Sequence, residues 1–153
     1  MKTIRANLWV YPLLSAAVAL MGLPVSAEPS SITVNVTGVH SQSGSVMVCL
    51  WRQQDKDFPV CSSTAAMQYI TAQSNNASAT VTFQNVPAGE YAVSAFHDEN
   101  QNGTLDRGFM GRPEEGIGFS NMTAQGGQGR PTFDKAKFTV NGQKSIALSL
   151  LYF

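Results

Sequence analysis

The sequence predicts an all-β protein: a single antiparallel β-sandwich of about seven strands with one long glycine-rich capping loop. Three observations lead to this class. Apolar and polar residues alternate with a period of two in several short segments. Turn residues separate these segments at the regular intervals that sandwiches show. No segment carries the apolar spacing of an amphipathic helix. A small closed barrel is the alternative.

The first two predicted strands differ in their burial pattern. In "SITVNVTGV", Ile32, Val34 and Val36 alternate with polar residues, which predicts a strand with one buried face. "SVMVCLWR" is a continuous apolar run after Ser-Gly, which predicts a strand buried on both faces. A weaker strand is expected in residues 66–72.

Two hairpins are predicted in the rest of the domain. "SATVTFQNV" alternates and ends at a turn containing Pro87 and Gly89, and "YAVSAF" follows directly. "AKFTV" and "SIALSLLY" flank "NGQK", and Asn-Gly is a strong signal for a two-residue hairpin turn.

The capping loop is expected in residues 98–135, where no strand is apparent and eight of the thirteen glycines fall. A loop of that length in a compact domain is usually functional or disordered. Apolar side chains spaced along it favour an ordered cap over one end of the sandwich; they are Phe109, Met110, Ile117, Phe119, Met122 and Phe133.

Residues 1–27 are predicted to be a secretory signal peptide. Lys2 and Arg5 precede the mainly apolar residues 8–23, and Val25-Ser26-Ala27 suits cleavage after Ala27. An uncleaved anchor helix is the alternative, which Pro12 disfavours. The mature chain, residues 28–153, would be one β-sandwich domain in the periplasm or the secreted medium.

The charge of the mature chain restricts its partners. Without the signal peptide, eight basic residues face ten acidic ones, a net charge of −2. We therefore expect no nucleic-acid partner, because no basic patch is available to neutralise phosphates. No later stretch is apolar over the length of a membrane helix. A small molecule, a carbohydrate or an envelope protein is the expected partner.

The two cysteines, Cys49 and Cys61, are expected to form a disulfide, because an even number in an exported chain favours pairing. The bond would close the loop "WRQQDKDFPV" and add about 3 kcal/mol in the chain-entropy model. Two reduced, buried thiols are the alternative.

The stretch "DENQNGTLD" resembles a calcium loop. Such loops take side-chain oxygens from positions one, three and five, Gly at six and a carbonyl from seven. Side-chain oxygens would here come from Asp98, Asn100, Asn102 and Asp106, and the carbonyl from Thr104. The expected cofactor is calcium.

The match to the calcium pattern is partial. Position twelve, normally Glu, is Phe109, and only two expected ligands of the loop are charged. The expected affinity is therefore weak, about 10⁻⁴ to 10⁻³ M. Glu114, Glu115 or Asp134 would complete the shell from farther along. The alternative is a hydrogen-bonded turn, because Asp and Asn cap turns with their own side chains.

Two other hypotheses concern function. In one, Phe109, Phe119 and Phe133 line a pocket for an apolar or carbohydrate ligand, and the polar loop is structural. In the other, His97 and Glu115 serve an envelope hydrolase. No set of nucleophile, base and orienting group can be assembled, and a lone His at a strand end is typically structural. We therefore expect a non-enzymatic binding or envelope-structural role.

Three segments, "FQNVPAGEYAVSAFHDENQNGTLD", "GRPEEGIGFSN" and "RPTFDKAKFTV", resemble a bacterial exported family of uncharacterised proteins, domain of unknown function 2141. The matching positions are Gly89, Tyr91, His97, Asp98, Asn100, Asn102, Gly103, Asp106, Gly111, Pro113, Glu115, Gly118, Phe119, Ser120, Asn121, Pro131, Phe133, Ala136 and Phe138.

This resemblance implies an Ig-like sandwich of the transthyretin or carboxypeptidase-regulatory type, located in the cell envelope, with no established reaction. It also implies that Glu115, rather than Glu114, is the remote carboxylate that completes the loop. The pair Cys49–Cys61 is not a feature of the family, so we interpret it as a local addition.

Overall fold

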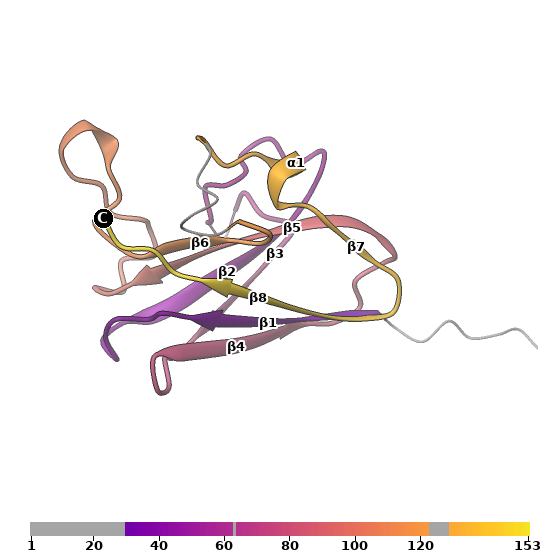
Figure 1. Cartoon of the computed structure of the whole chain (residues 1–153), viewed down its shortest axis with the longest axis horizontal. Coiled ribbons are helices and arrows are strands. Elements are labelled where there is room, and N and C mark those ends of the chain that lie inside the picture. The colour runs from indigo at the N-terminus through magenta and orange to yellow at the C-terminus, as the bar shows by residue number, and fades with distance from the viewer. Residues whose placement is uncertain (1–29, 63, 123–128) are drawn as a thin grey trace, which may run out of the picture.

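The protein is a sandwich of two β-sheets, seen in a computed structural model that describes residues 30–62, 64–122 and 129–153 (Figure 1). The smaller sheet has the order β4-β1-β8 and the larger β3-β2-β5-β6, with β7 also paired to β5. The strands are β1 Ser31–Thr37, β2 Ser45–Arg52, β3 Gln68–Ala72, β4 Ser78–Phe83, β5 Gly89–Asp98, β6 Ile117–Phe119, β7 Phe138–Val140 and β8 Gln143–Ser149. The described residues thus contain eight strands, and the predicted all-β sandwich is confirmed.

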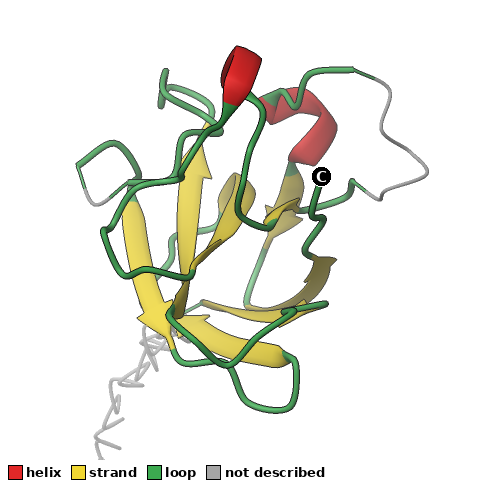
Figure 2. Cartoon of the chain, turned by 90° about the vertical axis from the view of Figure 1, so that its left-hand side faces the viewer, coloured by secondary structure: helices red, strands yellow, loops and turns green. Residues whose placement is uncertain are grey.

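Two short helical turns accompany the strands (red in Figure 2). They are the 3₁₀ turn η1 Phe109–Gly111 and the helix α1 Phe133–Ala136. Within the described residues, no helix is long and apolar enough to cross a membrane. The predicted signal peptide and its cleavage site after Ala27 lie outside the described residues.

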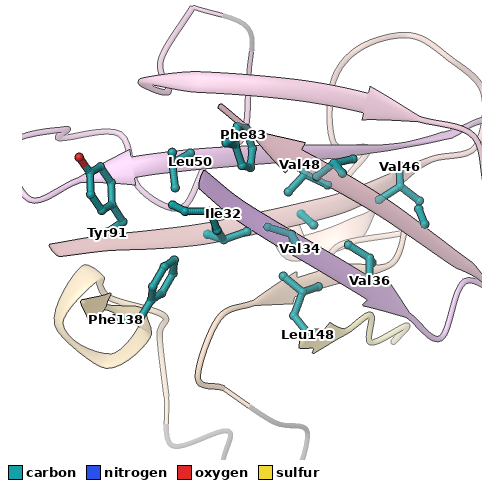
Figure 3. Packing of buried hydrophobic residues seen from close by; sticks show 14 of the residues in the cluster. Ile32, Val34, Val36, Val46, Val48, Leu50, Phe83, Tyr91, Phe138 and Leu148 are labelled. Atoms are coloured by element: carbon teal, nitrogen blue, oxygen red, sulfur yellow. The ribbon is translucent and has the colours of Figure 1, made fainter. Parts of the chain in front are cut away.

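The main core lies between the two sheets (Figure 3). Its central side chains come from the alternating positions of β1, and Ile32, Val34 and Val36 are fully buried, as predicted. The larger sheet opposes them with Val46 and Val48 of β2. Each such side chain contributes about 1.5–3 kcal/mol when it is fully removed from water.

The larger sheet is buried on its second face as well. The alternate positions of β2 hold Met47, Cys49 and Trp51, which pack in a second cluster with Phe96 of β5 and the half-buried Phe133. The prediction that "SVMVCLWR" is buried on both faces is therefore confirmed. Leu105 and Ile117 of the capping range also pack against this cluster, so the range covers part of the outer face.

The predicted disulfide between Cys49 and Cys61 is confirmed, with the two Cα atoms 5.5 Å apart. It ties the loop after β2 to the outer face of the larger sheet. Beside it, Trp51 Nε1 donates a hydrogen bond of 2.8 Å to Ser94 Oγ, so the buried indole nitrogen is satisfied.

The first predicted hairpin was wrong, because β4 lies in the smaller sheet and β5 in the larger one. The segment between them crosses from one sheet to the other. Tyr91 fixes this crossing by donating a hydrogen bond of 2.9 Å from its hydroxyl to the carbonyl of Pro87. A tyrosine that bonds back to the chain a few residues upstream is a known corner device of β-sandwiches.

The second predicted hairpin was also wrong. β7 pairs with β5, whereas β8 pairs with β1. A type I′ turn needs positive φ at both central residues. Gly142 has a φ of 92°, but Asn141 is not among the residues with positive φ, so the chain continues into the opposite sheet. The pair β1–β8 is parallel, whereas the other described pairs are antiparallel as expected.

The capping range 98–135 has more regular structure than the sequence predicted. The strand β6 within it pairs with β5, with Gly118 opposite Ala95. Glycine is required there, because a Cβ on Gly118 would lie 2.8 Å from Leu148 Cδ1 and 2.9 Å from the carbonyl oxygen of Ser149. A three-residue strand with a central glycine carries no alternation, which explains why it was missed.

We predict that Gly44→Ala destabilises the fold more than Gly111→Ala. The two glycines have matched φ values of 72° and 73°. A Cβ on Gly44 would lie 2.0 Å from the Asp98 carbonyl oxygen, whereas a Cβ on Gly111 would have no atom within 4 Å. The left-handed conformation alone costs about 1–3 kcal/mol. The clash at Gly44 should add roughly 1–3 kcal/mol. Urea unfolding measures both; equal losses would contradict the close packing against β5.

Candidate functional site

The acidic loop, residues 98–106, begins where β5 ends. The Asp98 carboxylate is 3 % exposed and its two oxygens accept backbone hydrogen bonds from inside the loop. Oδ1 accepts from the amide of Asn102 at 3.0 Å and Oδ2 from the amide of Gly103 at 2.8 Å. Because Gly103 takes a φ of 76°, the chain curls around this carboxylate.

Asp106 closes the other side of the loop. Its Oδ1 accepts from Asn102 Nδ2 at 2.9 Å, and its Oδ2 accepts from Asn100 Nδ2 at 2.6 Å. Asn102 Oδ1 in turn accepts from the amide and the hydroxyl of Thr104, at 2.8 and 2.9 Å. The structure thus brings together Asp98 and the four other loop residues that the sequence singled out.

Glu115 lies at the base of the acidic loop and is only 4 % exposed. Its Oε1 accepts from the amide of Glu99 at 2.9 Å, and its Oε2 accepts from the amide of Asp106 at 3.0 Å. Glu115 therefore joins the two ends of the loop. Of the other candidates, Asp134 lies on α1 within 3.5 Å of Lys137 Nζ, and Phe109 is 90 % exposed.

The acidic loop forms a hydrogen-bonded turn network in this structure. Across residues 30–62, 64–122 and 129–153, no group of three or more His, Cys, Asp and Glu side chains is placed to hold a metal ion. Each carboxylate oxygen keeps a further lone pair, and rotation of an Asn amide would present its oxygen in place of its nitrogen. The calcium hypothesis therefore stays a prediction.

A pocket of about 460 Å³ opens beside the loop, on the outer face of the larger sheet. Its described lining is mainly apolar, with two arginines: Pro59, Val60, Cys61, Ser62, Ala95, Phe96, Thr104, Leu105, Arg107, Pro113, Ile117, Phe119, Arg130 and Pro131.

Of the aromatic side chains predicted to line a pocket, Phe119 does so. Phe133 instead packs edge-on against Phe58, with ring centroids 6.2 Å apart. Phe109 projects into solvent, so its predicted place in the lining was wrong.

A family model described as "Uncharacterized protein conserved in bacteria (DUF2141)" matches residues 34–147 of the chain. The chain belongs to the DUF2141 family. The match runs from β1 into β8 and includes the acidic loop, Glu115 and the pocket. No match to the chain was found among curated proteins or solved structures.

In this DUF2141 chain, a second polar network lies next to the acidic loop. His97 is fully buried, with Nδ1 2.8 Å from Tyr152 Oη and Nε2 2.8 Å from the carbonyl oxygen of Ser43. Since a carbonyl only accepts, Nε2 donates to Ser43, and in the neutral tautomer that carries this hydrogen Nδ1 accepts from the Tyr152 hydroxyl. Both ring nitrogens of His97 are therefore bonded within the fold.

The sequence analysis missed Tyr152 as a member of this network. Its ring stacks on His40 at a centroid distance of 3.7 Å, and its hydroxyl accepts from the amide of His40 at 3.2 Å. Burial raises the pKa of Tyr152; the bond from the His40 amide lowers it, and Glu99 and Glu115 raise it further. No local pattern marks Tyr152, because its partners are far away in sequence.

We predict that Tyr152→Phe lowers the free energy of unfolding at neutral pH by about 1–3 kcal/mol, because His97 Nδ1 loses its donor. It should also weaken the pH dependence above pH 10. The folded wild type holds the Tyr152 proton to higher pH than the unfolded chain, so its stability falls as pH rises from the ordinary tyrosine pKa of 10.0 toward the raised folded pKa. Urea unfolding from neutral to alkaline pH measures this; identical slopes for wild type and variant would contradict it.

Proposed function

We propose that this DUF2141 protein is a non-enzymatic binding module of the bacterial envelope whose pocket takes an apolar small molecule. The observation that carries the proposal is the pocket of about 460 Å³ on the outer face of the larger sheet. Small-molecule sites are typically concave, about 300–1,000 Å³ in volume and mainly apolar. The predicted signal peptide supports an envelope or secreted location.

An apolar ligand fits the lining better than a carbohydrate does. Leu105, Ile117 and Phe119 line the pocket with partly exposed apolar surface, and a ligand that removes this surface from water gains free energy. A sugar would bury several hydroxyl groups there, and each would need a hydrogen-bond partner. Arg107 also lines the pocket, so a ligand with an acidic group at one end would be accommodated.

The buried titratable groups are hydrogen-bonded within the fold, which supports binding rather than catalysis. His97 bonds Tyr152 and Ser43 through its two ring nitrogens. The carboxylates of Asp98 and Glu115 accept backbone amides. Groups held in this way stabilise the loop and the strand end, which is the role we propose for them.

Filling the pocket should abolish ligand binding. Ser62 lines it, so Ser62→Trp places an indole in the space, whereas Thr71→Trp adds the same side chain at an exposed position of β3. We predict that Nile red fluorescence shows saturable binding to the wild type, with an affinity about tenfold lower in Ser62→Trp, a loss of about 1.4 kcal/mol. Thr71→Trp should bind like the wild type. Saturable binding that is unchanged in Ser62→Trp would sink the proposal, as would no binding at all.

The acidic loop favours a second candidate function, the binding of calcium to order the capping segment. Four side chains bearing oxygen, those of Asp98, Asn100, Asn102 and Asp106, meet around a turn that Gly103 already makes. Calcium prefers such oxygen ligands and tolerates irregular geometry. The Thr104 carbonyl and Glu115 would complete the shell.

Calcium should raise the melting temperature of residues 28–153, which contain every described strand, relative to EDTA. A cation at a hundred times its Kd adds about 2.7 kcal/mol, which corresponds to several degrees. Asp98→Ala should melt lower in EDTA, because two loop amides lose their acceptor, and should show no calcium response. Glu114→Ala, which removes the exposed neighbouring carboxylate, should keep the response. Equal melting of the wild type with and without calcium excludes the site.

A further inference from the structure

The largest exposed apolar side chains lie at the tip of a finger formed by residues 107–113. In the described part of the chain, Phe109 is 90 % exposed and Met110 is 89 % exposed, more than any other large apolar residue. The finger carries η1 and projects from the body beside the C-terminus (Figure 1, upper left; Figure 2, top). Contiguous exposed apolar side chains of this kind can mark a site of interaction with a protein or a membrane.

Hydrogen bonds hold the finger in a defined conformation. Arg107 and Pro113 form a β-bridge at its base, and the amide of Gly108 donates to the carbonyl of Arg112 at 2.9 Å. Near the tip, Arg107 Nη1 donates to the carbonyl of Gly111 at 3.0 Å. The exposure of the tip is therefore a consequence of its hydrogen bonding.

The backbone at the tip is strained. Met110 has φ 60° and ψ 22°, the left-handed conformation that residues other than glycine seldom adopt. Residues held in such conformations concentrate at functional sites. Here the conformation turns the chain sharply between Phe109 and Gly111.

Two arginines flank the apolar tip. Among the described residues, neither Arg107 nor Arg112 lies within 4.0 Å of a carboxylate oxygen. The Arg112 guanidinium stacks over the ring of Phe153 at 5.8 Å, and Phe153 is itself 62 % exposed. Glu114, whose carboxylate faces Gly108, leaves residues 107–114 with a net positive charge.

We propose that the finger docks this protein on an anionic lipid surface. Phe109 and Met110 would enter the boundary between headgroups and acyl chains, while Arg107 and Arg112 contact the headgroup phosphates. Aromatic and apolar residues beside basic ones form the usual pattern of interfacial membrane contacts. The inference does not depend on a ligand in the pocket or on calcium, although Arg107 also lines the pocket.

The shape of the finger favours lipid over a protein partner. A stable protein interface buries about 800 Å² on each side over a broad surface. A convex tip of two side chains offers much less, whereas a fluid bilayer closes around it. A single contact of this size predicts weak, reversible attachment.

The test is co-sedimentation of residues 28–153 with vesicles of phosphatidylglycerol mixed with phosphatidylcholine, and with phosphatidylcholine alone, in calcium and in EDTA. We expect binding to the anionic vesicles. Phe109→Ser/Met110→Ser should lower the partition coefficient about tenfold. Arg107→Gln/Arg112→Gln should remove the preference for anionic lipid. Tyr69→Ser, which removes another exposed apolar side chain on β3, should bind like the wild type.

A direct reporter separates insertion from surface adhesion. Trp51 is fully buried and gives a constant background, so Phe109→Trp adds a single responsive fluorophore to residues 28–153. Its emission should shift to the blue on anionic vesicles and be quenched by brominated lipid.

Three results would overturn the proposal: no vesicle binding in either buffer, full binding by the double serine variant, or an unchanged Phe109→Trp spectrum on bound vesicles. A concentration-dependent dimer that the serine variant loses would assign the finger to self-association instead. Urea unfolding checks that each variant remains folded.

Discussion

The buried carboxylate of Glu115 holds the capping segment in place. It accepts the amides of Glu99 and Asp106, so it joins the two ends of the acidic loop to the chain that enters β6. Removing it would leave two amides near the protein interior without an acceptor, a cost of about 1–3 kcal/mol each. The pocket wall at Leu105 and the base of the finger both continue from this junction, so their positions depend on the same carboxylate.

The sequence predicted the features that local patterns determine. Side chains in a strand alternate between its two faces. The alternation in β1 therefore indicates one buried face, and the continuous apolar run of β2 indicates two. The predicted compartment and the number of cysteines were enough to predict the disulfide. The partners of β4, β5, β7 and β8 were not accessible in this way. Alternation identifies a face but not a sheet, and the turn at Asn141 needed a φ value that the letters Asn-Gly only favour.

In the candidate site too, local features could be predicted from the sequence and long-range contacts could not. The acidic loop could be located from its spacing, because its contacts join residues at most six positions apart. The family resemblance pointed to Glu115, and the structure places it at the loop with its oxygens on backbone amides. Tyr152 and the pocket depend on contacts between distant segments. The orientation of Phe109 could not be predicted either, because the sequence of a loop without periodicity does not indicate whether an aromatic side chain points inward or outward.

The parallel pairing of β1 with β8 has a consequence for the order of assembly. The first strand of the smaller sheet has one neighbour in β4, but its second edge stays open until residues 143–149 have left the ribosome. A nascent chain that lacks this segment presents the unpaired backbone of Ser31–Thr37, which is a template for association with other strands. The smaller sheet is therefore complete only once β8 has emerged and paired with β1, and until then a chaperone that shields strand edges would have the most to do.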